Sequence, residues 1–203
     1  YLATRILSKP MVVRSWRDEQ AKSSFTNSKD HVFCDLTLLQ NRDVEIEPLK
    51  SSKISLGISV LQNELNIPFK KLCERYPDID TYYIVAQPDK NKREHHEFLL
   101  DDLWDQSPPI HLLITQRYHS AIWASKFGIP WVAVSDDPKL QALARDTTQP
   151  IISLTDRNLV DKLFNFVQSF PEPVRDQRLM DWYDSFSDQR HRVIGWLDEH
   201  LSN

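Results

Sequence analysis

Apolar runs alternate with amphipathic stretches from about residue 53 onward. Short runs rich in β-branched and aromatic residues are typical of buried strands. They occur at residues 53–59, 81–86, 111–115, 131–135 and 151–154. Helical spacing of apolar residues follows each of them, at residues 64–76, 93–104, 120–127, from Pro138 onward and at 156–170. Five strands, each followed by a helix, predict a Rossmann-like parallel α/β sheet with helices on both faces over residues 53–170.

The two flanks of this region follow different patterns. Residues 171–203 hold one or two polar helices whose aromatic side chains need a partner surface, so we expect them to pack across a domain boundary. Residues 1–52 contain little regular pattern. They predict short strands at 11–13 and 32–34 and a short helix at 18–25. Because this piece is too small to close its own core, we interpret it as the C-terminal tail of a preceding α/β domain.

Charge and composition exclude several classes of protein. The net charge is −4, and no cluster of Lys and Arg marks a nucleic-acid partner. No apolar run is long enough for a membrane span, and no signal peptide is recognisable. The three glycines, Gly57, Gly128 and Gly195, are too far apart for a dinucleotide fingerprint or a P-loop. Two cysteines, Cys34 and Cys73, make no disulfide framework, which fits a cytoplasmic protein.

Three candidate binding residues fall in two consecutive turns. Arg117 and His119 follow the strand predicted at 111–115, and Lys139 follows the next strand along the chain. Ligands of open parallel sheets bind at the carboxyl ends of strands, beside helix N-termini. Each such residue alone is most often a solvated surface group. Two cations and an imidazole on one edge, however, suit a small dianion such as a phosphate.

The segment 114–144 resembles the signature of the polysaccharide pyruvyl transferases. Arg-Tyr-His at 117–119 matches the family's Arg-Leu-His, with Tyr in place of Leu, and Asp-Pro-Lys at 137–139 matches its Asp/Pro–Lys turn. Two upstream pieces are also similar, one with Arg17-Asp18 and one with Asp35. The sequence departs from the family pattern where Thr115 replaces a glycine and where Ser135-Asp136 replaces an aromatic residue.

This resemblance implies a two-domain fold like that of GT-B glycosyltransferases, with the active site in the cleft and most of the N-terminal domain outside these residues. It implies transfer of pyruvate from phosphoenolpyruvate, as a ketal, onto a sugar of a polysaccharide or a lipid-linked glycan. Arg17, Arg117 and Lys139 are then the phosphoenolpyruvate-binding candidates. Arg117 and His119 are the catalytic candidates, and His119 is the group that handles the proton. No metal and no cofactor is expected.

Two alternative functions remain open at this point. A GT-B glycosyltransferase using a nucleotide sugar would share the fold and a cationic cleft, and a non-catalytic sugar-binding relative would share the fold. A metal site at His95-His96 is not favoured, because adjacent histidines on a helix point in different directions. The acceptor sugar and the oligomeric state are not predicted.

Overall fold

The structure is a computed structural model and describes residues 15–16, 31–32, 54–60, 66–85, 97–104, 109–170 and 174–201. The chain divides into two compact units. One is Asp43–Tyr183, and the other combines Tyr1–Arg42 with Asp184–Asn203. The domain boundaries expected after residues 52 and 170 stay predictions.

The larger unit contains one six-stranded sheet in which every pair of neighbouring strands is parallel. Its strands are β3 (Ser55–Ser59), β4 (Asp80–Val85), β5 (Glu97–Leu99), β6 (Leu112–Thr115), β7 (Trp131–Val134) and β8 (Ile151–Ile152). Their order is β5-β4-β3-β6-β7-β8, so the chain first builds to one side of β3 and then returns to build on the other side. The predicted Rossmann-like parallel sheet is confirmed, and the direction of strand addition reverses between β3 and β6.

The sheet has one strand more than the sequence pattern predicted. Residues 93–104 were expected to form a helix, but within their described part Glu97–Leu99 form β5 and only Leu100–Leu103 form helix α4. β5 pairs with β4 in the register Val85↔Leu99. The rings of Tyr82 and Phe98 lie 5.7 Å apart across this pair. Pairing with a neighbouring strand therefore overrides the helical spacing of a short apolar segment.

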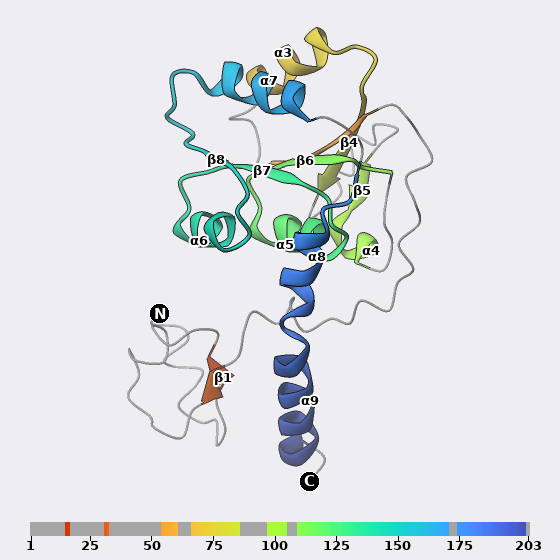
Figure 1. Cartoon of the computed structure of the whole chain (residues 1–203), viewed down its shortest axis with the longest axis vertical. Helices are drawn as coiled ribbons and strands as arrows, with labels where there is room; N and C mark the ends of the chain where they lie inside the picture. The colour runs from red at the N-terminus through yellow and green to blue at the C-terminus, as the bar shows by residue number, and fades with distance from the viewer. Residues whose placement is uncertain are drawn as a thin grey trace. The chain divides into compact units, whose positions relative to one another are not determined.

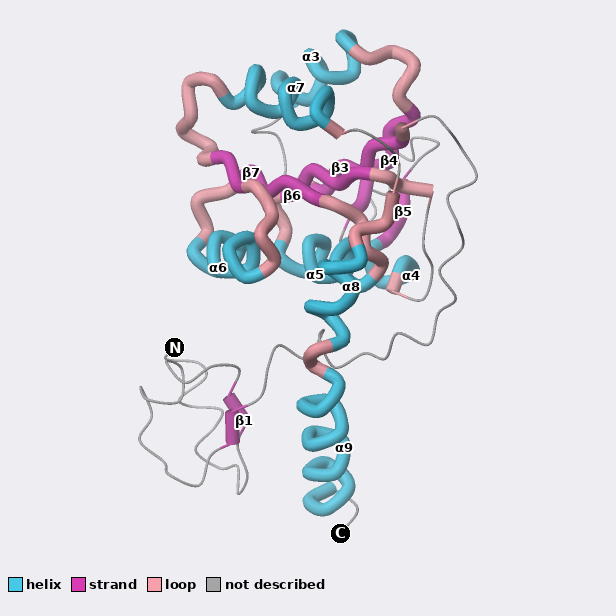
Figure 2. Tube along the Cα trace, in the orientation of Figure 1, coloured by secondary structure: helices cyan, strands magenta, loops and turns pink. Residues whose placement is uncertain are grey.

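Helices cover both faces of the sheet, as predicted (Figure 1). They are α3 (Asn66–Arg75), α4, α5 (Tyr118–Lys126), α6 (Pro138–Asp146), α7 (Leu159–Ser169) and α8 (Gln177–Asp184). Helices α3 and α7 lie together on one face, and α4, α5, α6 and α8 lie on the other, with the strands between the two layers (Figure 2). Two-sided coverage is the arrangement that near-continuous apolar strands require.

The central strands β3, β6 and β7 are buried at every position. Alternate residues of these strands face α3 and α7 and form the main core cluster with Leu72, Leu163 and Val167. The strand residues of this cluster are Leu56, Ile58, Leu112, Ile114, Val132 and Val134. Each buried aliphatic side chain contributes about 1.5–3 kcal/mol of burial free energy. This core fixes the carboxyl ends of β3, β6 and β7 relative to one another.

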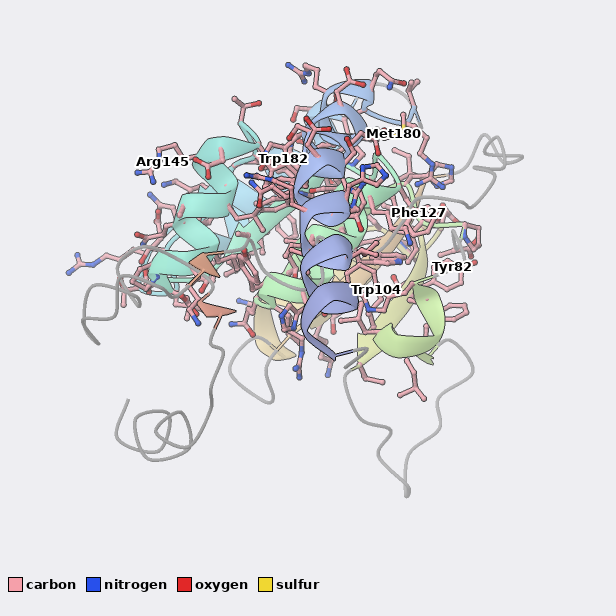
Figure 3. All side chains as sticks on the ribbon, turned by 90° about the horizontal axis from the view of Figure 1, so that it is seen from below. Tyr82, Trp104, Phe127, Arg145, Met180 and Trp182 are labelled. Atoms are coloured by element: carbon pink, nitrogen blue, oxygen red, sulfur yellow. The ribbon has the colours of Figure 1, made fainter. Side chains whose placement is uncertain are left out.

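Helix α8 packs against the turn at Gly128 that follows α5. Gly128 has a φ of 63°, the left-handed conformation that commonly ends a helix. Its carbonyl oxygen accepts a hydrogen bond of 2.7 Å from the Asp176 N–H, just before α8 begins. The Cγ of Met180, a residue labelled in Figure 3, lies 2.9 Å from where a Cβ on Gly128 would be, and Tyr183 of the same helix is fully buried. The first part of the C-terminal region therefore packs on the sheet unit.

The smaller unit contains a two-stranded parallel sheet and a helix. Strand β1 (Ser15–Trp16) pairs with β2 (His31–Val32), and α9 spans Ser187–Leu201. The strand predicted at 11–13 and the helix predicted at 18–25 lie outside the described residues. None of the helices that the structure describes is both long enough and apolar enough to cross a membrane.

Candidate active site

Arg117 is held in a turn made by the residue that ends β6. The Oγ1 of Thr115 accepts a hydrogen bond of 2.9 Å from the Arg117 N–H. This is a turn in which a threonine hydroxyl binds the backbone two residues further on. Arg117 keeps an extended backbone with φ −106° and ψ 125°, and α5 begins at Tyr118. Thr115 therefore sets the point at which the strand changes into a helix.

The same turn is connected to the end of β3, across the place where the strand order reverses. The Gln116 N–H donates to the Ser59 oxygen at 2.8 Å, and the Arg117 Nε donates to the Val60 oxygen at 3.3 Å. Below them, the hydroxyls of Ser59 and Ser120 lie 2.7 Å apart and are both fully buried. In open α/β sheets the crevice at such a reversal is where ligands bind. Here an arginine lies at the reversal, with its Nε bonded to the residue that follows β3.

The guanidinium of Arg117 has capacity for a ligand. Arg117 is half-buried, and its Nε is used by Val60. Within the described part of the chain, its terminal Nη1 and Nη2 atoms make no hydrogen bond to protein, and no acidic side chain pairs with it. A planar guanidinium can bind a carboxylate or phosphate through two parallel N–H···O bonds. The geometry therefore suits an anion beside β6.

His119 lies in the first turn of α5, two residues beyond Arg117. Its side chain is exposed, and its ring contacts Tyr118 edge to face with 5.7 Å between the ring centroids. The first N–H groups of a helix lack partners within the helix and attract negative charge. His119 is thus an accessible imidazole next to the place where an anion would be held.

Lys139 follows the next strand along the chain, β7. Helix α6 begins at Pro138, and Asp137 caps it by accepting a hydrogen bond of 2.8 Å from the Lys139 N–H. The Asp137 N–H in turn donates to the Ser135 Oγ at 3.0 Å. The Lys139 side chain is exposed, and none of the acidic residues that the structure describes forms an ion pair with it. Lys139 supplies a second positive charge at the start of a helix.

Because β6 and β7 are adjacent and parallel, their carboxyl ends share one edge of the sheet. The structure therefore places Arg117, His119 and Lys139 at the same edge, as the sequence predicted. Arg17, the other predicted binding residue, lies outside the described residues.

Sequence reasoning missed the hydroxyl residues that build this edge. The turn at Thr115 recurs at the ends of the next two strands, where Ser135 accepts from the Asp137 N–H and Ser153 accepts from the Thr155 N–H at 3.1 Å. Each of these residues lies at the end of a strand or just after it. The signal that could have revealed them is a Ser or Thr at the end of each successive apolar run.

A metal centre has no support in the described residues. No group of three or more His, Cys, Asp and Glu side chains among them is arranged to hold a metal ion. The pair His95-His96 lies outside the described residues.

No protein-family model and no curated protein matches this sequence. Solved structures do resemble the fold. A UDP-N-acetylglucosamine 2-epimerase matches with a TM-score of 0.59 at 11% identity, over 100% of this chain and 61% of that one. The MnaA protein of S. aureus, solved with UDP, matches with a TM-score of 0.55 at 11% identity, over 91% and 57%. The Neisseria meningitidis UDP-GlcNAc 2-epimerase bound to UDP-GlcNAc matches with a TM-score of 0.52 at 10% identity, over 90% and 58%.

This chain therefore spans 57–61% of the length of these structural neighbours, which are enzymes. At such low identity the likeness shows the fold alone. The larger unit is the Rossmann-like half of a GT-B fold, with a parallel six-stranded sheet covered by helices.

Proposed function

We propose that this chain is the donor-binding part of a GT-B-like enzyme, and that its donor is an anion held at the carboxyl ends of β6 and β7. The observation that carries the proposal is the state of Arg117, whose Nε is bonded to the Val60 oxygen and whose terminal nitrogens bond to no described residue. Lys139 adds a second charge at the neighbouring helix start. Charges that no described acidic side chain compensates favour an anionic ligand.

The donor that the residues support best is phosphoenolpyruvate, and the reaction is pyruvyl transfer to a sugar. Arg-Tyr-His at 117–119 and Asp-Pro-Lys at 137–139, which resemble the pyruvyl transferase signature, lie at one edge of the sheet. Phosphoenolpyruvate carries a phosphate and a carboxylate. In this proposal Arg117 binds one of them through paired N–H groups and Lys139 supplies a point charge. Arg17 stays a further candidate that rests on the resemblance alone.

The proposed chemistry assigns a separate role to His119. A proton is added to the methylene carbon of the donor, which leaves an oxocarbenium-like centre. A sugar hydroxyl attacks this centre, phosphate leaves with the C–O electron pair, and a second hydroxyl of the same sugar closes the ketal. An imidazole exchanges protons near neutral pH, so His119 donates or relays the proton. The acceptor is a sugar of a polysaccharide or of a lipid-linked glycan.

A nucleotide sugar is the second candidate donor, and the structural comparisons by themselves favour it. Two of the neighbours were solved with UDP or UDP-GlcNAc. In this alternative, the diphosphate takes the place of phosphoenolpyruvate between Arg117 and Lys139, and no pyruvate is transferred. The wide spacing of Gly57, Gly128 and Gly195 gives no glycine-rich phosphate loop, which weighs against a nucleotide.

A thermal-shift experiment separates the two donors. A ligand that binds only the folded chain raises its stability by about 2.7 kcal/mol at 100 times its Kd. We expect phosphoenolpyruvate to raise the Tm and UDP-GlcNAc to leave it unchanged. The Arg117→Ala variant should lose the shift, whereas Arg145→Ala should keep it, because Arg145 is exposed at the far end of α6. A shift with UDP-GlcNAc alone would establish the second candidate, and a shift with neither would favour a non-catalytic relative.

A further inference from the structure

We infer that Thr115 is a positioning residue that aims Arg117 at the donor. The inference rests on the proposed function, because it takes the anion bound by Arg117 as its purpose. It concerns a residue that replaces a glycine of the pattern which this segment resembles. A glycine could make the same turn through backbone freedom alone, but it has no hydroxyl with which to hold its neighbour.

The Thr115 hydroxyl contacts both strands that border the strand-order reversal. It accepts the Arg117 N–H at 2.9 Å. Its single proton has two acceptors within reach, the Ser59 oxygen of β3 at 3.2 Å and the Arg117 oxygen at 3.1 Å. Thr115 is fully buried, and its bond from the Arg117 N–H is partly buried. Loss of the hydroxyl leaves this N–H without its partner in the turn.

This hydroxyl determines the direction of the Arg117 side chain. The Arg117 Nε reaches the Val60 oxygen on the β3 side from a backbone that is extended at Arg117. At 3.3 Å that side-chain bond is longer than an ordinary N–H···O bond and holds the guanidinium weakly by itself. The buried Ser59–Ser120 pair supports the first turn of α5 but does not touch Arg117. Thr115 is therefore the contact that keeps Arg117 directed toward the end of β3.

The chain offers a matched control. Ser153 makes the same kind of turn after β8, where its Oγ accepts the Thr155 N–H at 3.1 Å. No anion-binding residue of the proposed site follows that turn. Ser153→Ala therefore removes a hydrogen bond of the same pattern, at an exposed turn, without affecting the direction of Arg117.

The first experiment measures phosphoenolpyruvate binding to the 203-residue chain by calorimetry. Thr115→Val should weaken binding about tenfold, Thr115→Ser should restore it to within about threefold, and Ser153→Ala should leave it unchanged. In an Arg117→Ala background, Thr115→Val should add no further loss, because the two residues act as one unit. Unchanged affinity in Thr115→Val, or the same loss with and without Arg117, would overturn the inference.

The second experiment needs no ligand, so it distinguishes failure of this inference from failure of the proposed function. The Arg117 Nε–H signal in NMR should exchange slowly with solvent in the original chain and in Thr115→Ser. It should be lost in Thr115→Val, or in Thr115→Ala if the valine variant does not fold. If the hydroxyl-free variant keeps a slowly exchanging signal, Thr115 does not position Arg117. If the signals behave as expected but phosphoenolpyruvate does not bind, the positioning stands and the choice of donor is wrong.

Discussion

The Nε of Arg117 donates a hydrogen bond of 3.3 Å to the main-chain oxygen of Val60, so a residue that follows β6 is tied to the end of β3. This bond crosses the position at which the strand order reverses. It uses the Nε alone, and the terminal nitrogens make no bond to any described residue. The proposed function follows from this relationship.

Replacing Arg117 by Lys should weaken donor binding more than turnover. Lysine keeps the charge, but it loses the bond to Val60 and the paired N–H groups. Hydrogen bonds to charged groups contribute about 1.5–3 kcal/mol, so the Kd for phosphoenolpyruvate should rise roughly tenfold to hundredfold. Calorimetry measures this change, and Arg145→Lys, at an exposed position, is the control. An unchanged Kd would mean that Arg117 does not bind the donor.

Replacing His119 by Asn should lower turnover and largely preserve donor binding. Asparagine retains hydrogen-bonding capacity but does not titrate. Turnover should fall by roughly 10² to 10⁴, the usual effect of lost acid–base catalysis. The assay follows ketal formation on the acceptor sugar, with His191→Asn, an exposed residue of α9, as the control. Equal losses of binding and turnover would make His119 a ligand and place the proton donor elsewhere.

Replacing Gly128 by Ala should destabilise the sheet unit. The added Cβ would lie 2.9 Å from the Met180 Cγ and 3.0 Å from the Asp176 oxygen, at a φ that L-residues rarely adopt. Strain and overpacking together should lower the free energy of unfolding by about 1–3 kcal/mol. Urea unfolding measures this value.

Gly195 provides the opposite control, because nothing lies within 4 Å of its added Cβ and it sits inside α9. Gly195→Ala should therefore be neutral or stabilise by up to about 1 kcal/mol. If Gly128→Ala left the free energy of unfolding equally unchanged, α8 would not pack against the turn at Gly128 as described.

Acid should weaken the folded state through His111. Burial, and then the positive charge of Arg175, lower the pKa of His111 below its ordinary value of 6.5. Its Nδ1 also accepts a hydrogen bond of 2.9 Å from the Ser55 N–H. Below pH 6.5, His111 binds a proton in the unfolded chain but stays neutral in the folded chain. The free energy of unfolding therefore falls as the pH drops from 6.5 toward the folded-state pKa of His111. Above 6.5 both states are neutral at this residue, and its contribution is constant.

Urea unfolding between pH 5 and pH 8 measures this effect. His111→Asn retains an acceptor for Ser55 without titrating, so it should flatten the acid side of the curve. His191→Asn, at an exposed position, should leave the curve as it is. The same slope in both variants would show that another group carries the acid sensitivity.

The sequence predicted most of the sheet because its central strands are buried on both faces. The runs at 111–115 and 131–135 correspond to β6 and β7 to within one residue. β5 was missed because Glu97–Leu99 is too short to show a period, and only its pairing with β4 makes it a strand. Long-range pairing of this kind leaves no local pattern in the sequence.

The candidate site was predictable in position but not in construction. Arg117, His119 and Lys139 follow strands, and residues that follow parallel strands gather at one edge of a sheet. The contacts of Arg117 with Val60 and of Thr115 with Ser59 could not be predicted, because they depend on β3 pairing with β6. The strand order that creates this pair is a property of the folded sheet.

The crystal structure of this chain soaked with phosphoenolpyruvate tests the central claim most directly. The account predicts density for the ligand at the carboxyl ends of β6 and β7. Its phosphate or carboxylate should lie within hydrogen-bond distance of the Arg117 terminal nitrogens, with the Lys139 ammonium beside it and His119 facing the methylene carbon. A parallel soak with UDP-GlcNAc should leave this place empty. Phosphoenolpyruvate bound away from Arg117, or UDP-GlcNAc bound at this edge in its place, would contradict the account.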